Sequence, residues 1–334
     1  MHSVTTGQMP EDDSPAQDRL ESLLALARGF IPARVFLTAV ELGVFARLDD
    51  SPQTAADLAR LLDADPRAMD ALLHALAALG LLTKQGEIFA NVPEVAQYLL
   101  PGGGGGFQHA AHVWEMWSRL TEIVKTGITG PPKWPDELSK DFAQAMNHYA
   151  RASADRVARL VDCTDVVSML DVGGGGGCFA VAFAKRYPHL TVALVEQSEP
   201  ALEVATELMT RERLQERVRL WKGDFMADDL GGGYGLALLS SILCLFSAEA
   251  NLALLGRIKR SLLPGGRVVI RDALVDDART RPAAAAIFSV HVVLTSRQGR
   301  AYSTGEVKRW LRGVGFRDVY ALPVHPGELV VGRV

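Results

Sequence analysis

The residues most able to do chemistry together are a run of glycines and the acidic residues around it. Asp171 and Val172 end an apolar stretch that leads directly into five glycines at positions 173–177. Glycines after a strand let a ligand approach the backbone, and the helix that follows turns its free amides and positive dipole end toward that ligand. Taken alone, such a run also fits an ordinary tight turn between a strand and a helix.

Two carboxylates downstream make the pattern more specific. Glu196 ends the next apolar stretch, where its carboxylate can accept hydrogen bonds from both hydroxyls of a ribose. Asp224 follows the third stretch, placed to meet an adenine amino group, with Phe225 beside it for ring contact. A nicotinamide dehydrogenase shares only the glycines and the first carboxylate. The expected cofactor-binding residues are Asp171, Gly173, Gly174, Gly175, Glu196, Asp224, Phe225 and Ser240.

These residues need a sheet to position them. From residue 166 onward short β-rich runs alternate with helical segments, which predicts a parallel sheet with crossover helices. The last two runs, around His325-Pro326-Gly327, predict an antiparallel hairpin at the sheet edge. We therefore expect an α/β fold whose residues 163–334 form a Rossmann-like, mostly parallel seven-stranded sheet. The expected strands are 166–172, 191–196, 217–222, 235–240, 267–272, 318–324 and 328–334.

The N-terminal part has helical spacing instead. Apolar residues recur at helical intervals over residues 20–48, with Pro32 and Gly43 as interruptions, which predicts two helices. Two more amphipathic helices are expected on either side of Asp65-Pro66. Two short extended pieces follow them, so the order is that of a winged-helix domain.

A winged helix raises the question of DNA binding. Its candidate recognition helix, residues 66–80, contains one arginine and one aspartate among mostly apolar residues. DNA readers need lysines and arginines there to neutralise phosphates and reach base edges. We therefore expect no nucleic-acid binding, and we expect this helix to be buried in a core or a subunit interface. The winged-helix dimerisation domain is expected over residues 17–105.

The segment between the two domains, residues 106–162, is expected to be a helical linker that forms one wall of a substrate pocket. The glycines 102–106 mark a break before it, and a helix is expected over Asp141 to Val161. Large side chains cluster in its first helix and could line an aromatic pocket, although ordinary helix packing fits them as well. They are His109, His112, Trp114, Met116 and Trp117.

Composition limits the classes of function. The chain has 334 residues, 48% hydrophobic, with a formal net charge of −4. That charge gives no basic field to attract nucleic acid or an anionic membrane. Three scattered cysteines indicate neither a disulfide framework nor a metal site. Residues 1–16 are polar and acidic, so we expect a disordered tail without a signal peptide. No later apolar run looks long enough to span a membrane, which predicts a cytoplasmic protein.

The complete pattern resembles a known family. The set DVGGGGG, Glu196 and GDF is similar to class I S-adenosylmethionine (SAM)-dependent methyltransferases. With FAQAMNHYARAS and LLPGGRVVIRD added, residues 17–334 resemble the plant-type and bacterial small-molecule O-methyltransferases of secondary metabolism. The resemblance implies SAM as cofactor, S-adenosylhomocysteine (SAH) as product, a homodimer and a small-molecule substrate. The substrate-pocket residues expected on this basis are His112, Trp117, Met146, Tyr149 and His291.

One departure from the family concerns catalysis. The family's LLHDW-type segment supplies a histidine as general base, whereas this chain has LLSSILCLF, with Cys244 at that place. Cys244 is a candidate nucleophile or base, but its apolar neighbours favour a packing role by raising its pKa. His291 is the other candidate. Bacteriochlorophyll C-20 methyltransferases look similar, because they too lack the usual histidine and have one near this point; the alternative for His291 is interface packing.

Three functions therefore compete. The first is methyl transfer to a small aromatic or polycyclic metabolite with a carbon, nitrogen or oxygen acceptor, without the usual histidine, since positioning alone supplies much of the acceleration. The second is a non-methylating reaction on the same scaffold, such as hydroxylation, decarboxylation or rearrangement. The third is a non-catalytic binding protein, against which the complete cofactor motif argues.

Overall fold

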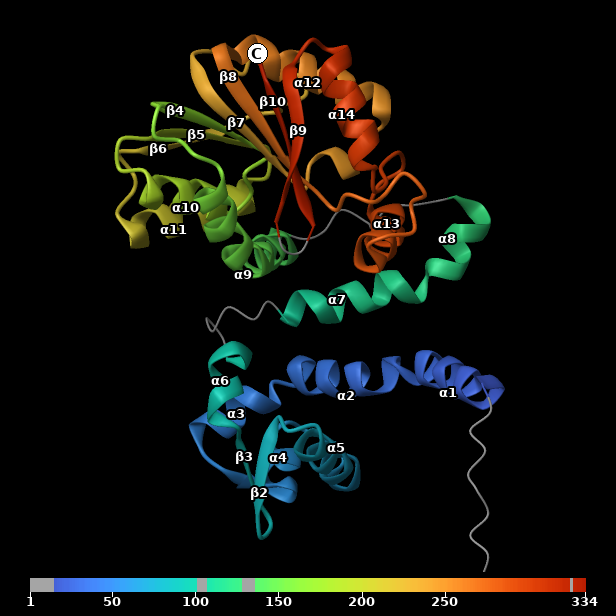
Figure 1. Ribbon diagram of the computed structural model, residues 1–334. Coiled ribbons are helices and arrows are strands. Elements are labelled where there is room, and N and C mark those ends of the chain that lie inside the picture. Colours follow the sequence, from blue (N-terminus) through green and yellow to red (C-terminus); the bar gives the residue numbers. More distant parts are fainter. Residues whose placement is uncertain (1–14, 101–106, 128–135, 325–326) are drawn as a thin grey trace, which may run out of the picture. The chain divides into compact units, whose positions relative to one another are not determined.

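The computed structural model describes residues 15–100, 107–127, 136–324 and 327–334. By their contacts the residues divide between Gly103 and Gly104 into two compact units (Figure 1). The predicted glycine break at 102–106 and nearly all of the predicted tail lie outside the described residues. The further division of the second unit at residue 162, into a pocket wall and a cofactor domain, stays a prediction.

The first unit is mainly helical and has a small sheet in the order β1-β3-β2. Helix α4 is capped by the Thr54 side chain, which accepts from Asp57 N, and α5 by that of Asp65, which accepts from Ala68 N. The predicted break at Asp65-Pro66 is thus correct, and β2 and β3 form the wing. The elements are α1 (Pro15–Arg28), α2 (Phe30–Glu41), α3 (Val44–Asp50), β1 (Gln53–Thr54), α4 (Ala55–Leu61), α5 (Pro66–Ala78), β2 (Leu82–Gln85), β3 (Ile88–Asn91) and α6 (Pro93–Leu99).

Helix α5 uses its apolar stripe for packing. Its buried residues Met69, Leu73 and Leu76 recur at helical spacing, and each is at most 2% exposed. The helix is therefore a core helix of this unit, as the sequence predicted.

Helices α1 and α2 differ from the sequence-based expectation in two ways. The break falls at Gly29 rather than at Pro32, because Pro32 lies in the first turn of α2, where a missing N–H costs no hydrogen bond. Residues Gln17–Glu41 also form a 25-residue helical stretch that is long and apolar enough to cross a membrane by length and composition. The expectation that no run is long enough was wrong in that respect.

The second unit contains a seven-stranded sheet with helices on both faces (Figure 1). Its helical elements are α7 (Phe107–Ser118), α8 (Leu120–Thr126), α9 (Asp136–Leu160), α10 (Cys178–Arg186), α11 (Glu199–Glu212), the 3-10 helix η1 (Leu243–Leu245), α12 (Ala248–Ser261), α13 (Ala283–Thr295) and α14 (Thr304–Gly313). Its strands are β4 (Ser168–Val172), β5 (Thr191–Glu196), β6 (Val218–Lys222), β7 (Tyr234–Ser240), β8 (Leu262–Arg271), β9 (Arg317–Pro323) and β10 (Glu328–Arg333).

The strand order is β6-β5-β4-β7-β8-β10-β9. Strands β4 to β8 pair in parallel, whereas β10 pairs antiparallel with both β8 and β9. This confirms the predicted seven strands and the terminal hairpin at the edge. Two elements begin five residues earlier than predicted: α9 at Asp136 and not at Asp141, and β8 at Leu262 and not at Arg267. The order reverses at β4, which has β5 on one side and β7 on the other. Ligands of open α/β sheets bind at such a reversal, at the carboxyl ends of the strands.

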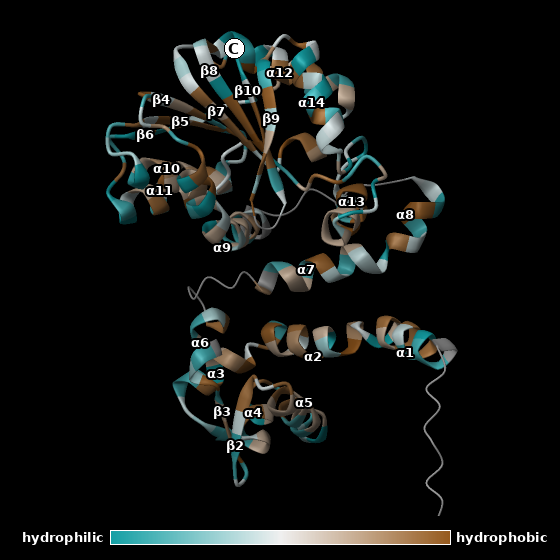
Figure 2. Cartoon of the chain, in the orientation of Figure 1, coloured by the Kyte–Doolittle hydropathy of each residue, from teal (hydrophilic) through white to brown (hydrophobic). Residues whose placement is uncertain are grey.

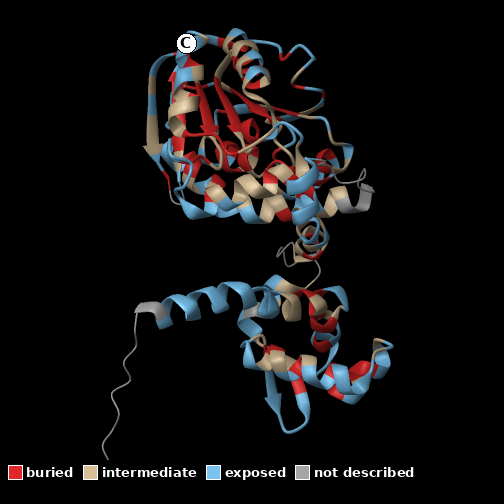
Figure 3. Ribbon diagram, turned by 90° about the vertical axis from the view of Figure 1, so that its right-hand side faces the viewer, coloured by how far each residue is buried: buried red, intermediate tan, exposed pale blue. Residues whose placement is uncertain are grey.

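Two apolar clusters hold the sheet between its helices. One joins β4, β5 and β7 to α9, α10 and α11, and the other joins the opposite face to α12 and α14. The central strands are accordingly apolar in Figure 2 and buried in Figure 3. Strands that are covered on both faces are apolar nearly throughout, as β4 is in the sequence.

Candidate cofactor and substrate site

The glycine loop follows β4, and at four of its five positions an added Cβ would collide with neighbouring protein atoms. Gly173 N donates to Val195 O at 2.8 Å, which holds the loop beside β5. Gly173 and Gly175 have positive φ angles of 63° and 53°. At Gly174, a Cβ atom would lie 2.5 Å from Leu194 Cγ and 2.9 Å from Asp171 Oδ2. The backbone therefore lies open to a ligand because these positions are glycine.

Two carboxylates lie beside the loop. Asp171 is 1% exposed, and within the described part of the chain its Oδ2 has no hydrogen-bond partner. Burial, and then the charge of Glu196, raise the pKa of Asp171 to about 7. Glu196 accepts from Gly175 N at 3.1 Å and from Ser198 N at 2.8 Å. These bonds fix the Glu196 carboxylate at the loop while lone pairs remain for a ribose.

The remaining predicted cofactor residues stand at neighbouring strand ends. Asp224 follows β6, and its Oδ1 accepts from Met226 N at 2.8 Å, so the carboxylate is held by its own turn. Phe225 is buried, and one of its ring carbons would lie 3.1 Å from a Cβ at Gly173, which places the ring next to the glycine loop. Ser240 is the last residue of β7.

The set fits an adenosine cofactor in two respects that do not depend on any bound molecule. At Gly175 nothing in the described chain lies within 4 Å of an added Cβ, which leaves space for a ligand beside the loop, and a buried carboxylate oxygen of Asp171 has no partner among the described residues. The two predicted adenosine contacts, Glu196 and Asp224, follow adjacent strands, β5 and β6, at the same carboxyl edge. Within the described ranges no three His, Cys, Asp or Glu side chains gather as a metal site would require.

Asn147 on α9 is a functional candidate that the sequence analysis did not identify. Its Nδ2 donates to Gly176 O at 2.7 Å, and its Oδ1 accepts from Cys178 N at 3.2 Å. A Cβ at Gly176 would lie 2.3 Å from Asn147 Nδ2. The side chain therefore ties α9 to the glycine loop and to the first turn of α10. No local pattern signals this, because the contact joins residues 29 positions apart.

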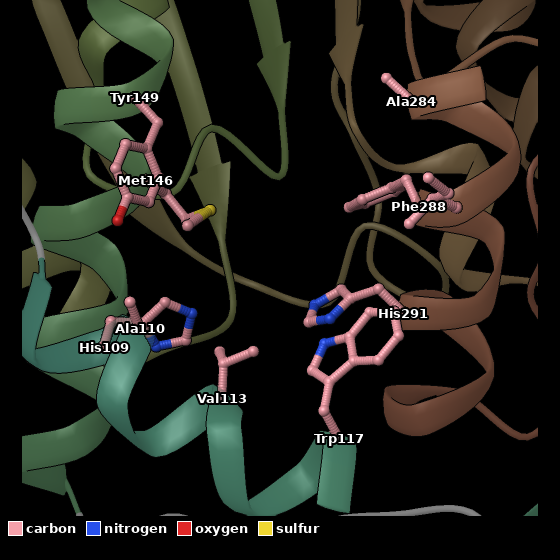
Figure 4. Close-up of a pocket in the computed structure, with 10 residues that line it drawn as sticks. His109, Ala110, Val113, Trp117, Met146, Tyr149, Ala284, Phe288 and His291 are labelled. Carbon is pink, nitrogen blue, oxygen red and sulfur yellow. The ribbon is translucent and has the colours of Figure 1, made fainter. Parts of the chain in front are cut away.

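A cavity of about 410 Å³ lies between α7, α9 and α13 (Figure 4). The described residues that line it include no Lys, Arg, Asp or Glu. Trp117 of α7 and His291 of α13 stack with ring centroids 6.2 Å apart, and Phe288 lies 5.6 Å from His291. The lining residues are His109, Ala110, Val113, Trp117, Met146, Tyr149, Ala284, Ile287, Phe288 and His291.

The two cavity histidines are neutral near pH 7. Burial first, and then the positive charges of His291 and His112, lower the pKa of His109 to about 4. Burial also lowers the pKa of His291. Neutral imidazole keeps one nitrogen that can accept a proton or a hydrogen bond.

The cavity includes four of the five predicted pocket residues: Trp117, Met146, Tyr149 and His291. His112 is on α7 but does not line the cavity. The lining residues on each helix follow helical periodicity: His109, Val113 and Trp117 are four apart on α7, as are Ala284 and Phe288 on α13, with His291 three further on. Of these, Val113, Ala284 and Phe288 were not predicted. That spacing was readable in the sequence, but which face turned toward α9 was not.

Cys244 lies in η1 and not in the cavity wall. It is 1% exposed, and burial, followed by the carboxylate of Asp272, raises its pKa well above the usual value. Cys244 N donates to Asp272 Oδ2 at 3.2 Å. A buried thiol that keeps its proton is neither a strong nucleophile nor a ready base.

Comparison with known proteins gives the family. The O-methyltransferase domain matches residues 131–317, and the O-methyltransferase dimerisation domain matches residues 24–102. The tetracenomycin polyketide synthesis 8-O-methyltransferase TcmO of Streptomyces glaucescens is 32% identical over 93% of this chain and 96% of its own. The N,N-dimethyltransferase OxyT of Streptomyces rimosus is 34% identical over 78% of this chain and 80% of its own.

A solved structure agrees in fold and carries a ligand of the same cofactor class. PigF of Serratia sp., solved with SAH, superposes with a TM-score of 0.85 at 23% identity and covers 94% of this chain and 99% of its own. Together with the two domain matches and the cradle around Gly173–Gly177, this identifies the cofactor as SAM. The chain belongs to the O-methyltransferase family and is a SAM-dependent methyltransferase.

Proposed function

We propose that the chain methylates a small aromatic or polycyclic metabolite bound in the cavity between α7, α9 and α13, with His291 as the residue that contacts the acceptor atom. The observation that carries the proposal is the lining of that cavity: aromatic rings, aliphatic side chains and two neutral histidines, with no charged group among the described lining residues. Pockets of about 300–1,000 Å³ with apolar walls and few polar groups are typical small-molecule sites.

The cavity and the cofactor loop share helix α9. Met146 and Tyr149 line the cavity from α9, and Asn147 of the same helix turn bonds the glycine loop. The proposed cofactor residues are Asp171, Gly173, Gly174, Gly175, Glu196, Asp224, Phe225 and Ser240. When bound there, SAM supplies a methyl group on a sulfonium, and the helix brings that group and the acceptor pocket into one framework, which favours in-line displacement by positioning.

His291 is the better base of the two histidines. A general base works best when its pKa is near the working pH, and the pKa of His109 is lowered to about 4. His291 has a smaller shift and a ring held between Trp117 and Phe288 (Figure 4). We therefore assign proton acceptance to His291 and hydrogen bonding of the substrate to His109. Cys244 has a packing role, since it is buried outside the cavity.

The assignment of His291 as base bears on the identity of the acceptor atom only where that atom must lose a proton. TcmO is by name an O-methyltransferase and OxyT an N,N-dimethyltransferase. A phenol needs a base because its pKa is about 10, whereas a neutral amine does not. We propose oxygen as the acceptor, because a half-buried neutral histidine in the cavity wall is of most use to a phenol.

The test compares His291→Ala, His291→Gln and the control His112→Ala, whose residue lies outside the cavity. SAH formation is measured with hydroxylated and aminated naphthalenes and anthraquinones. We expect turnover of phenols to fall about a hundredfold to ten-thousandfold in both His291 variants, and amine turnover and the control to change little. Phenol turnover within about threefold of wild type would exclude His291 as base. Tight SAH binding without SAH formation from any acceptor would favour a non-methylating reaction.

We also infer that the chain works as a homodimer without nucleic acid or membrane partners. The dimerisation domain match begins at residue 24 and covers the end of α1 and all of α2, where Leu26 and Phe30 are 80% and 54% exposed; Leu20, earlier on α1, is 56% exposed. Large exposed apolar side chains on one helical stretch are typical of a subunit interface. Light scattering should give twice the chain mass of 36.1 kDa, and a monomer at micromolar concentration would contradict the inference. A cytoplasmic location stays a prediction.

A further inference from the structure

Arg271 is the last residue of β8 and lies at the same carboxyl edge of the sheet as the glycine loop. Its Nη1 donates to Ser241 Oγ at 3.0 Å, just beyond β7. Its guanidinium carbon lies 5.9 Å from the ring centroid of Phe179, in the first turn of α10. The guanidinium therefore bridges the space between the end of β7 and the start of the helix that follows the glycine loop.

The charge of this guanidinium is only partly balanced, because it acts on the carboxylate of the next residue, Asp272, without forming an ion pair with it. Among the described residues no carboxylate lies within ion-pair distance of Arg271, and its one hydrogen bond goes to a neutral hydroxyl. Arg267, four residues earlier on the same strand, instead pairs with Asp165 at 3.2 Å and donates to Asp162 O at 2.6 Å. An arginine has five N–H donors, so most of those of Arg271 are available to a ligand.

The surroundings place the charge beside the cofactor loop. The positive charge of Arg271 acts on the thiols of Cys178, which begins α10, and of Cys244, which lies in η1 after β7. The positive dipole end of α10 adds to the potential at this point. Because the described residues that line the cavity include no charged side chain, an anionic ligand group that reaches the end of β8 would meet Arg271.

We propose that Arg271 binds an anionic oxygen of a bound ligand. Two sources have this chemistry: the carboxylate that ends the amino-acid tail of SAM, and an ionised carboxylate or phenolate of the acceptor. The planar guanidinium matches a carboxylate with two parallel hydrogen bonds, which an ammonium does not. The inference rests on the proposed placement of the cofactor at Gly173–Gly177, Glu196 and Asp224.

The experiment uses Arg271→Met and Arg271→Lys in the full-length protein. Calorimetry compares SAH with 5′-methylthioadenosine, which lacks the amino-acid tail, and then compares 2-naphthoate with the neutral 2-naphthamide on the SAH complex. Loss of a charge-assisted hydrogen bond weakens binding about tenfold to a hundredfold. If the cofactor tail is the ligand, Arg271→Met is expected to weaken SAH binding by that factor and to leave the affinity for methylthioadenosine unchanged. If the acceptor is the ligand, the variant loses the preference for naphthoate instead.

Arg267→Met is the matched control, since it removes an arginine from the same face of the same strand at the opposite edge of the sheet. It is expected to lower the melting temperature. It should leave unchanged the ratio of the affinities for SAH and methylthioadenosine and the ratio of the affinities for naphthoate and naphthamide. Arg271→Lys is expected to recover part of the lost affinity because it keeps the charge. If both ratios in Arg271→Met equal those of the wild type, the proposal is overturned. Failure of the wild type to bind either nucleoside would instead contradict the cofactor site itself.

Discussion

Replacing Asn147 with alanine should separate the cofactor loop from the wall of the substrate cavity. The side chain bonds Gly176 O through Nδ2 at 2.7 Å and Cys178 N through Oδ1 at 3.2 Å. Alanine removes both bonds and leaves space next to Gly176, where the amide now lies in van der Waals contact with the backbone. The glycine loop and the first turn of α10 would then be held mainly by their own backbone bonds.

The magnitude follows from the two bonds. Each neutral hydrogen bond contributes about 1 kcal/mol net, and loss of a capping acceptor at a helix start costs about the same. The sum of about 2 kcal/mol is an upper limit on the loss of cofactor affinity, since a bound cofactor orders part of the loop again. We therefore expect the dissociation constant of SAH to rise by about fivefold to thirtyfold. The chain as a whole should lose only a few degrees of melting temperature.

Calorimetry with SAH and thermal unfolding without ligand measure the two effects separately. Gln144→Ala is the control, because this residue is exposed on the same helix. Asn147→Asp keeps the acceptor for Cys178 N and should retain more affinity than Asn147→Ala. An SAH dissociation constant within twofold of wild type, together with a lower melting temperature, would refute the coupling and leave Asn147 with a purely structural role.

Three further predictions concern the loop and the residues next to it. Gly174→Ala forces a Cβ to within 2.5 Å of Leu194 Cγ and should weaken SAH binding more than tenfold. The control Gly313→Ala on α14 places a Cβ that meets nothing within 4 Å, so this variant should bind SAH as the wild type does. Equal SAH affinities of the two variants would contradict the binding of the cofactor at the glycine loop. The Asp171 pKa of about 7 exceeds its unfolded value near 3.8, so its contribution to the free energy of unfolding is complete below pH 4 and is lost as the pH rises through 7. Because the ammonium group of the SAH tail favours the ionised Asp171 carboxylate, SAH binding at pH 6 should release protons, as titrations in buffers of different ionisation enthalpy measure. Asp171→Asn should abolish the release, and proton uptake would disprove the assignment. Cys244→Ala should lower the melting temperature and keep turnover, and a hundredfold loss of turnover would restore Cys244 as a catalytic residue.

The sheet and the cofactor loop were predictable because they are encoded locally. A strand, its glycines and the next helix are contiguous from β4 to α10, and each further carboxylate follows its own strand, so regular spacing along the chain becomes adjacency at one edge. Residues in contact across long separations were not predictable in this way. Asn147 and Arg271 lie within segments that carry the family resemblance, FAQAMNHYARAS and LLPGGRVVIRD, but neither segment indicates their contacts, which depend on the packing of α9 against α10 and of β8 against β7.

In helix α7 the helical periodicity of the sequence is not sufficient to predict which residues line the cavity. Its aromatic residues and histidines predicted a pocket wall, and Trp117 is in that wall, but His112 is not, whereas His109 is. The two histidines are three residues apart and differ by less than one turn, so only the angle at which α7 meets α9 and α13 decides between them. The sequence therefore predicted the helix that carries the pocket, but not the face.

The segment after β7, where the sequence analysis expects Cys244 in place of the family's histidine, is held by three side-chain hydrogen bonds to its backbone carbonyls. Asn251 Nδ2 donates to Leu243 O at 2.9 Å, Ser296 Oγ to Leu245 O at 2.7 Å, and the Tyr302 hydroxyl to Phe246 O at 2.6 Å. These bonds hold η1 in place. The donors of two of them, Ser296 and Tyr302, come from the chain at and beyond the end of α13. Helix α13 also carries His291 into the cavity, so the same part of the chain that holds η1 supplies the proposed proton acceptor. On that proposed assignment the burial of Cys244 removes no base, and His291 is the residue whose removal should matter most for phenol acceptors.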